Sequence, residues 1–132
     1  MPVFNKYADF SGRAMRTDFW YFMLFLNLSF FFFVLLDAVI GTFHTRLGFG
    51  LLSGIFALLL LFPAVAVSVR RLHDTNRSGW WMLIWWMPIA VNVINSTLIF
   101  SILSLMGAVV LVVFWCQPSD SGVNRFGKKP NE

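Results

Sequence analysis

The chain has 132 residues, of which 58% are hydrophobic and only 12% are charged. Soluble domains are typically about 45–50% apolar and about 25% charged, so a soluble domain of this size could not bury this much apolar surface. Ten Lys and Arg against six Asp and Glu give a net charge of +4, and long uncharged runs separate the charges. The composition therefore excludes an ordinary soluble domain and indicates an integral membrane protein.

The uncharged runs predict the membrane-spanning helices, because about 20 mostly apolar residues are needed to cross roughly 30 Å of hydrocarbon. The first run, 19–40, contains a single charge at Asp37, and the second, 49–69, contains none. The third uncharged stretch is too long for one crossing, and a polar cluster in its middle predicts a turn between helices 80–95 and 98–116. We therefore predict an all-α membrane fold, a bundle of four transmembrane helices in a single domain, 1–132.

The distribution of Lys and Arg predicts the orientation of this bundle. Nine of the ten lie in the segments 1–18, 70–79 and 117–132, which a four-helix topology places on one side, and only Arg46 lies on the other. Short loops rich in Lys and Arg stay in the cytoplasm. We therefore expect both termini to be cytoplasmic, with a short interfacial helix within 1–18 and a cytoplasmic tail, 117–132.

The first polar motif, residues 10–20, reads FSGRAMRTDFW. Ser11 can cap a short helix in which Arg13 and Arg16, three residues apart, would share one face. Asp18 would lie in the first turn of the first membrane helix, where its negative charge is favourable for the helix dipole.

The second motif, residues 70–81, reads RRLHDTNRSGWW and is expected to form the loop between the second and third helices. Asn76 suits a left-handed turn, a conformation that asparagine tolerates. Asp74 could bind one arginine through both carboxylate oxygens and leave the others for phosphate. The motif ends in Trp80 and Trp81, whose indole rings favour the membrane–water interface.

The third motif, residues 124–130, reads NRFGKKP and has turn chemistry at its glycine. Across the three motifs, the residues expected to structure the loops are Asp18, His73, Asp74, Asn76, Gly79, Asn124 and Gly127.

In order and spacing, the three motifs resemble the DUF805 family of small bacterial inner-membrane proteins. The family pattern in the middle of the chain is R-R-L-H-D-T-G-R-S-G-W-W, and eleven of its twelve positions are matched here. The departures are Asn76, where the family usually has glycine, and Asp18, where it often has glutamate. The resemblance implies a location in the bacterial inner membrane, and it implies no particular activity.

Two interpretations of the arginines remain open. They can simply anchor cytoplasmic loops, touching anionic head groups at about 1 kcal/mol each. Alternatively, they form an internal network with Asp18 and Asp74, and the remaining arginines face lipid phosphate, because the planar guanidinium suits carboxylate and phosphate contacts. The residues expected to bind lipid, phosphate or a partner are Arg13, Arg16, Arg70, Arg71, Arg77, Trp80 and Trp81.

Two acidic residues raise further functional hypotheses. The adjacent pair His73 and Asp74 has too few further His or Asp residues nearby for a metal site, and the arginines would repel a cation, so we expect a hydrogen-bonding role and no metal or cofactor. Asp37 lies within an apolar run and is a possible intramembrane polar site. It can reach the outer interface, pair with Arg46 or His44, or belong to a proton or ion pathway.

The sequence therefore predicts a non-enzymatic inner-membrane protein of unknown physiological role. Its cytoplasmic face is expected to bind anionic membrane phospholipid or a protein partner, with homo-oligomerisation possible and no nucleic acid involved. The alternative is a small transporter or channel. That function would require several copies around a pore, because one copy offers too few buried polar residues to line a conduit.

Overall fold

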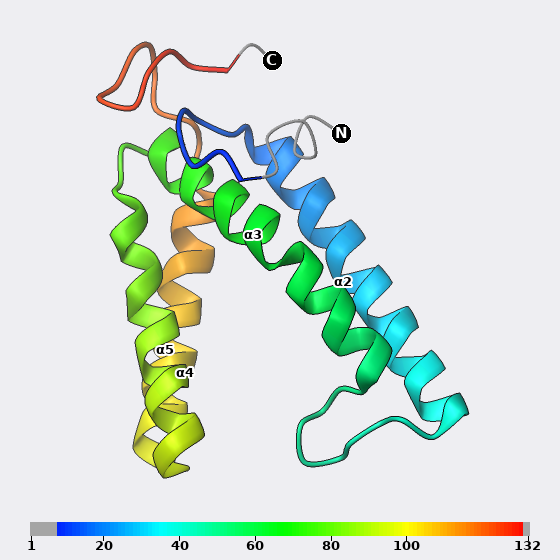
Figure 1. Cartoon of the computed structure of the whole chain (residues 1–132). Helices are drawn as coiled ribbons and strands as arrows, with labels where there is room; N and C mark the ends of the chain where they lie inside the picture. The colour runs from blue at the N-terminus through cyan, green and yellow to red at the C-terminus, as the bar shows by residue number, and fades with distance from the viewer. Residues whose placement is uncertain (1–7, 131–132) are drawn as a thin grey trace. The chain divides into compact units, whose positions relative to one another are not determined.

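A computed structural model describes residues 8–130 of the chain, and this part is all-helical (Figure 1). The described residues form four α-helices and one short 3-10 helix, with no β-strand among them. In chain order these are α2 (Arg16–Ile40), α3 (Leu51–Asp74), η1 (Gly79–Met82), α4 (Leu83–Asn95) and α5 (Leu98–Cys116).

The chain divides into two compact units, which are described separately. The first is built mainly from Thr17–Val67, and the second from Phe10–Arg16 together with the chain from Ser68 onward. Helix α3 is continuous across this division and contributes to both units.

In the first unit, α2 and the first part of α3 form a helical hairpin (Figure 1). The aromatic ring of Phe33 on α2 packs against that of Phe56 on α3, with 4.8 Å between the ring centroids. The connecting loop, 41–50, is closed by a bridge between His44 and Phe49. Helix α2 begins three residues before the predicted position 19, so Asp18 lies in its first turn.

Helix α3 continues to Asp74, five residues beyond the predicted end at 69, so the first part of the basic motif is helical. Two residues after its end, Asn76 adopts the left-handed conformation expected from the sequence, with a φ of 57°. The amide of Asn76 donates to the carbonyl oxygen of His73 at 3.0 Å, and the amide of Arg77 donates to that of Leu72 at 2.9 Å. This pair of hydrogen bonds defines a Schellman motif, which satisfies the last carbonyl groups of the helix.

The second unit contains the α4–α5 hairpin (Figure 1). The helix predicted at 80–95 is divided into η1 and α4, and the side chain of Ser78 accepts a hydrogen bond from the Trp80 amide at the start of η1. The turn between α4 and α5 is tight and includes Ser96 at a φ of 29°. The hairpin packs closely at Gly107, where an added Cβ would overlap the backbone carbonyl of Ile84.

The segment that precedes α2 differs from the expectation. Residues 8–15 contain no helix, and residues 1–7 lie outside the described part of the chain. The prediction that Arg13 and Arg16 share one helical face is therefore wrong. Gly12 adopts a φ of +77°, which is incompatible with a continuing helix, and the chain turns so that Arg13 is buried while Arg16 remains exposed.

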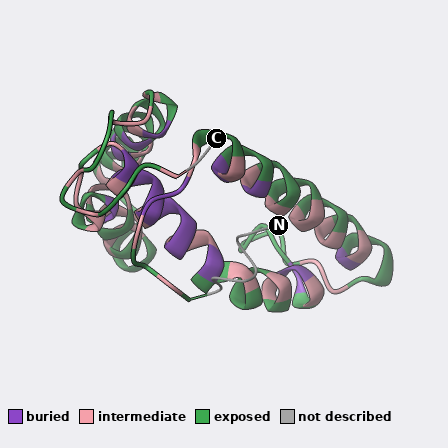
Figure 2. Cartoon of the chain, turned by 90° about the horizontal axis from the view of Figure 1, so that it is seen from above, coloured by how far each residue is buried: buried purple, intermediate pink, exposed green. Residues whose placement is uncertain are grey.

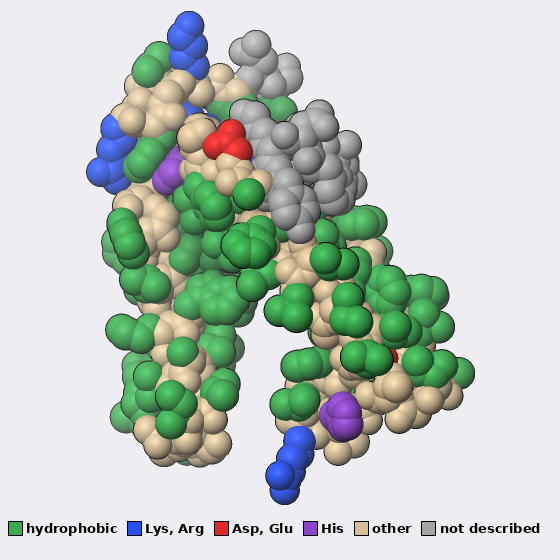
Figure 3. Space-filling model, viewed as in Figure 1, with side chains coloured by type: hydrophobic (Ala, Val, Ile, Leu, Met, Phe, Trp, Pro, Cys, Tyr) green, Lys and Arg blue, Asp and Glu red, His purple; other side chains and the backbone are tan. Residues whose placement is uncertain are grey.

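Three of the described helices, α2, α3 and α5, are long and apolar enough to cross a membrane. Hydrophobic side chains cover much of the visible surface of the helices in each unit (Figure 3). Large apolar residues on these helices are exposed, among them Val39 at 83%, Leu58 at 69% and Leu105 at 67%. Continuous apolar surfaces of this kind are rare on soluble monomers and match the hydrocarbon of a bilayer.

The close contact at Gly107 generates a prediction about the α4–α5 hairpin. Gly107→Ala should lower the free energy of unfolding by about 1–3 kcal/mol, because the new methyl group meets the Ile84 backbone, which cannot move without shifting α4. Thermal unfolding of the detergent-purified protein measures the effect.

Gly54→Ala is the matched control, because a Cβ there would meet only the Phe49 side chain, at 3.4 Å. The control should be neutral or slightly stabilising, since alanine favours helix. Equal melting temperatures for Gly107→Ala and the wild type would show that the two helices are not packed at this glycine.

Candidate functional site

The three polar motifs meet in the second unit around the carboxylate of Asp74, which is fully buried. One of its oxygens accepts a hydrogen bond from Nε of Arg13 at 2.9 Å. The other accepts hydrogen bonds from Nη1 of Arg71 and from the hydroxyl of Ser119. Asp74 therefore pairs with two arginines, one on each oxygen, whereas the sequence predicted a bidentate pair with a single arginine.

Arg13 ties the N-terminal segment to the tail that follows α5. Its Nη2 donates to the carbonyl oxygen of Asp120 at 2.6 Å and to that of Asp74 at 3.3 Å. Its Nη1 donates to the carbonyl oxygens of Gly122 at 2.8 Å and of Gly127 at 3.4 Å. The donors of this guanidinium are thus distributed over the loop and the tail.

Arg71 joins the end of α3 to the end of α5. Its Nε donates to the carbonyl oxygen of Trp115 at 3.0 Å, and its Nη2 donates to the carbonyl oxygen of Gln117. The last carbonyl groups of a helix have no partner within the helix and carry partial negative charge, so a cation is favourable there. Arg71 satisfies these carbonyls of α5 while its side chain remains fully buried.

This cluster places two guanidinium groups and one carboxylate out of contact with solvent. Buried charges are tolerated only when they are paired and their remaining hydrogen-bonding groups are satisfied. The single carboxylate of Asp74 neutralises one of the two positive charges. The remaining N–H groups of the two guanidinium groups donate to backbone carbonyl oxygens. Figure 2 shows buried residues concentrated along a helical run, and those at the end of α3 include Ser68, Arg70, Arg71, Leu72 and Asp74.

His73 also has a structural role. Its ring is stacked on Phe126, with 3.9 Å between the centroids and 4° between the planes. Its Nδ1 lies 3.1 Å from the carbonyl oxygen of Gly12, which can only accept, so Nδ1 carries the proton of this hydrogen bond. Within residues 8–130, no three His, Cys, Asp or Glu side chains lie together in a way that could hold a metal ion.

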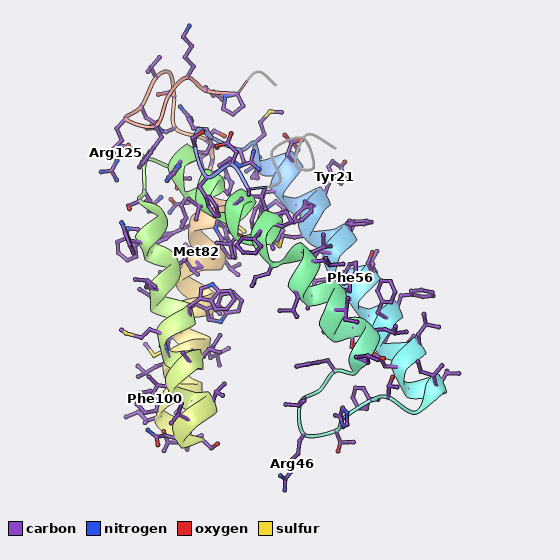
Figure 4. All side chains as sticks on the ribbon, in the orientation of Figure 1. Tyr21, Arg46, Phe56, Met82, Phe100 and Arg125 are labelled. Carbon is purple, nitrogen blue, oxygen red and sulfur yellow. The ribbon has the colours of Figure 1, made fainter. Side chains whose placement is uncertain are left out.

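The tail motif forms a tight turn against this histidine. The side-chain amide of Asn124 donates to the carbonyl oxygen of His73 at 2.9 Å, and its oxygen accepts from the amide of Phe126 at 2.9 Å. Asn124 and Gly127 exchange backbone hydrogen bonds, and Gly127 has a φ of 122°. Arg125 lies at the outer edge of the turn (Figure 4), where its Nη2 donates to the Asn76 carbonyl at 3.1 Å.

The predicted binding residues thus fall into two groups. Arg13, Arg70 and Arg71 are buried, whereas Arg16 and Trp80 are exposed.

Asp18, which was also expected to bind arginine, lies in the first turn of α2. Asp74, in contrast, forms ion pairs with both Arg13 and Arg71.

Arg77 is the partly exposed arginine of the middle motif. Its guanidinium carbon lies 4.1 Å from the centre of the Phe114 ring, and its Nη1 donates weakly to the Thr75 carbonyl at 3.4 Å. Trp81 contacts the same Phe114 ring edge-on at 5.3 Å, and it is 43% exposed, while Trp80 is 78% exposed. We refer to Arg77, Trp80 and Trp81 as the arginine–tryptophan face.

Several residues of the site carry no clear signal in the sequence. These are Phe114, Ser119, Asp120 and Gly122, whose contributions depend on where α5 lies and on the path of the tail after it. Three of the groups that Arg13 and Arg71 bind, at Trp115, Gln117 and Gly122, are backbone carbonyls, which every residue possesses. The proline and glycines after α5 predict a turning tail, and they are the only signal in the sequence that the tail could fold back toward Arg13.

In the first unit, Asp37 caps the N-terminus of α3. Its carboxylate accepts hydrogen bonds from the amides of Leu52 at 2.9 Å and Ser53 at 2.8 Å. The hydroxyls of Ser53 and Thr42 also donate to it, each at 2.6 Å. A negative charge is favourable at the positive end of a helix, and these hydrogen bonds satisfy amides that have no partner within it.

The hypothesis that Asp37 pairs with Arg46 or His44 is wrong. The Asp37 oxygens are occupied by the start of α3 and by Thr42. Arg46 extends from the loop away from α2 and α3 (Figure 4).

The Asp74 cluster generates a stability prediction. Asp74→Asn should lower the free energy of unfolding by about 3–5 kcal/mol, because it leaves two buried guanidinium groups without a counter-charge. Thermal unfolding in detergent measures the change. The matched control is Asp120→Asn, since the Asp120 side chain forms no hydrogen bond with the described residues and only its backbone is held. A melting temperature for Asp74→Asn equal to that of the control would contradict the assigned role of Asp74.

Comparison with known proteins agrees with the resemblance of the three motifs. Residues 7–128 match the family model described as "Protein of unknown function (DUF805)". The chain is 37% identical over 131 residues to inner membrane protein YhaH of Escherichia coli strain K12, covering 98% of this chain and 93% of YhaH. It is 35% identical over 132 residues to inner membrane protein YhaI of the same strain, covering 98% of this chain and 92% of YhaI. No solved structure matches the chain significantly. The chain therefore belongs to the DUF805 family, and its relatives YhaH and YhaI are inner membrane proteins.

Proposed function

We propose that this protein is a non-enzymatic, four-helix inner-membrane protein whose cytoplasmic face binds phospholipid head groups, with a preference for anionic lipids. The observation that carries the proposal is the state of Arg77. Arg13 and Arg71 are buried and distribute their donors over internal acceptors, whereas Arg77 is stacked on Phe114 and has one weak backbone acceptor among the described residues.

The surroundings of Arg77 suit a phosphate. A guanidinium group binds phosphate through two parallel hydrogen bonds, and stacking on an aromatic ring fixes its plane in advance. Trp80 and Trp81 lie close along the chain and expose indole rings, which favour the level of the lipid head groups. We prefer a lipid to a protein partner because these tryptophans would place Arg77 at that level.

The topology that underlies this proposal is supported by the contacts of Arg13. Arg13 precedes α2 and is bonded to Asp74, at the end of α3, and to Asp120, which follows α5. These three positions therefore lie on the same side of any membrane that the chain spans. An even number of crossings must separate each from the next, so α2 and α3 cross as a pair, and α4 and α5 cross as a pair.

The length of α4 is compatible with a crossing when η1 is included. Thirteen residues of α-helix rise about 20 Å, and four residues of 3-10 helix add about 8 Å, against roughly 30 Å of hydrocarbon. We infer that η1 and α4 together form the third transmembrane segment. The excess of Lys and Arg in the segments that Arg13 joins assigns that side to the cytoplasm.

Reporter fusions test this topology. A reporter that is active only in the cytoplasm should be active when fused near either end of the chain, and a periplasm-only reporter should be active when inserted in the 41–50 loop. A periplasmic signal from the C-terminal fusion would overturn the pairing of α4 with α5.

Lipid binding is tested by native mass spectrometry of the detergent-purified protein. Arg77→Gln should lower the retention of phosphatidylglycerol about tenfold, because a charge-assisted contact to phosphate is lost. Arg46→Gln removes the same charge from the 41–50 loop and should leave retention unchanged. Retention by Arg77→Gln equal to that of the wild type would sink the proposal.

The other function considered, an oligomeric transporter, would depend on Asp37 and Asn27. The Asp37 carboxylate accepts hydrogen bonds from the first turn of α3, and the Asn27 amide donates to the Met23 carbonyl within α2 at 2.7 Å. Both groups therefore have internal structural partners, and the arginine–tryptophan face is the better supported site.

A further inference from the structure

An open hollow of about 540 Å³ lies next to Arg77, between the loop that follows α3 and the start of the tail. Its volume falls within the range of about 300–1,000 Å³ that is usual for ligand sites. The residues that line it are Thr75, Asn76, Arg77, Gln117, Pro118 and Asp120. Thr75, Asn76 and Gln117 have neutral polar side chains, Arg77 and Asp120 are charged, and only Pro118 is apolar. The hollow is therefore polar as well as open, as a lipid head group with its acyl chains outside would require.

The two charged residues of the hollow have opposite signs and do not pair with each other. Arg77 and Asp120 line one hollow, and neither forms an ion pair with another described residue. The backbone of Asp120 is fixed on both sides, since its amide donates to the Asp74 carbonyl at 2.9 Å and its carbonyl accepts from Arg13 at 2.6 Å. The backbone of Asp120 is thus fixed at the edge of the hollow, while its carboxylate forms no hydrogen bond with the described residues.

We propose that this hollow seats a phospholipid head group that carries both a phosphate and an ammonium group. The phosphate lies at Arg77 and the ammonium group lies at Asp120. The inference rests on the proposed function, because Arg77 is the phosphate-binding group in both, and it adds Asp120 as the residue that determines head-group selectivity.

The selectivity follows from the sign of the charges. Arg77 attracts the phosphate of any phospholipid, so Arg77 alone favours lipids with a net negative charge. A carboxylate in the same hollow repels a head group that is only negative and attracts an ammonium group. Asp120 therefore raises the affinity of the hollow for a head group such as phosphatidylethanolamine, and it reduces the advantage that Arg77 gives to anionic lipid.

A competition experiment measures this preference. The wild type and its variants are equilibrated with equal amounts of phosphatidylethanolamine and phosphatidylglycerol, and the retained lipids are counted by native mass spectrometry. Asp120→Asn should lower the ratio of retained phosphatidylethanolamine to phosphatidylglycerol about tenfold. Asp18→Asn makes the same charge change at a residue that does not line the hollow, and it should leave the ratio unchanged.

The variants also separate this inference from the proposed function. Arg77→Gln should lower the retention of both lipids. If Asp120→Asn leaves the ratio unchanged while Arg77→Gln lowers phosphatidylglycerol retention, the role of Asp120 is wrong and the proposed function stands. If Arg77→Gln alters neither lipid, both are wrong. An unchanged melting temperature for Asp120→Asn establishes that its effect is on binding.

A soluble ligand would present the same chemistry, and a further measurement distinguishes it. We assign the hollow to a membrane lipid because of the neighbouring tryptophans. Free phosphoethanolamine at millimolar concentration should not displace retained phosphatidylethanolamine, since it lacks acyl chains. Displacement that requires Arg77 and Asp120 would overturn the assignment to a lipid.

Discussion

Two buried guanidinium groups share one buried carboxylate in this protein, and the surplus positive charge must be stabilised by backbone carbonyl oxygens. Those oxygens come from the end of α5 and from the tail beyond it. The two guanidinium groups are therefore satisfied only where the N-terminal segment, the end of α3 and the tail come together. With neutral side chains in place of Arg13, Arg71 and Asp74, these three segments could separate without exposing an unpaired charge. The fold of this end of the molecule therefore depends on the hydrogen bonds of the two arginines.

The extent to which this site is predictable from the sequence differs from residue to residue. The left-handed turn at Asn76 follows from a property of the residue itself, and the family pattern has glycine there, the residue that suits this position of a Schellman motif best. The pairing of Asp74 with arginine follows from charge and proximity in sequence. Its division between Arg13 and Arg71 does not, because the remaining partners of both arginines are backbone carbonyls, which have no signature in the sequence. The same limitation explains why Arg13 was expected on a helical surface with Arg16.

The helices that are long and apolar enough to cross a membrane are easier to predict, because hydropathy is a property of single residues summed along the chain. α2, α3 and α5 follow directly from it. The contacts between the helices do not follow from hydropathy. Asp37 stands out as an acid within an apolar run, but its role as a cap depends on the loop that returns the chain to Leu52 and Ser53. The role of Gly107 has no signal in the sequence, because a glycine in an apolar helix gives no indication of which backbone it approaches.

The attachment of the tail to Arg13 has a consequence for the order in which the protein matures. Arg13, Arg71 and Asp74 are synthesised early, whereas Ser119, Asp120 and Gly122 follow all of the helices. During translation the early residues can meet, but their guanidinium groups lack the acceptors that arrive last. The charge centre therefore stays incompletely satisfied until the tail has been synthesised, so its last acceptors are supplied by the part of the chain that is made after α5.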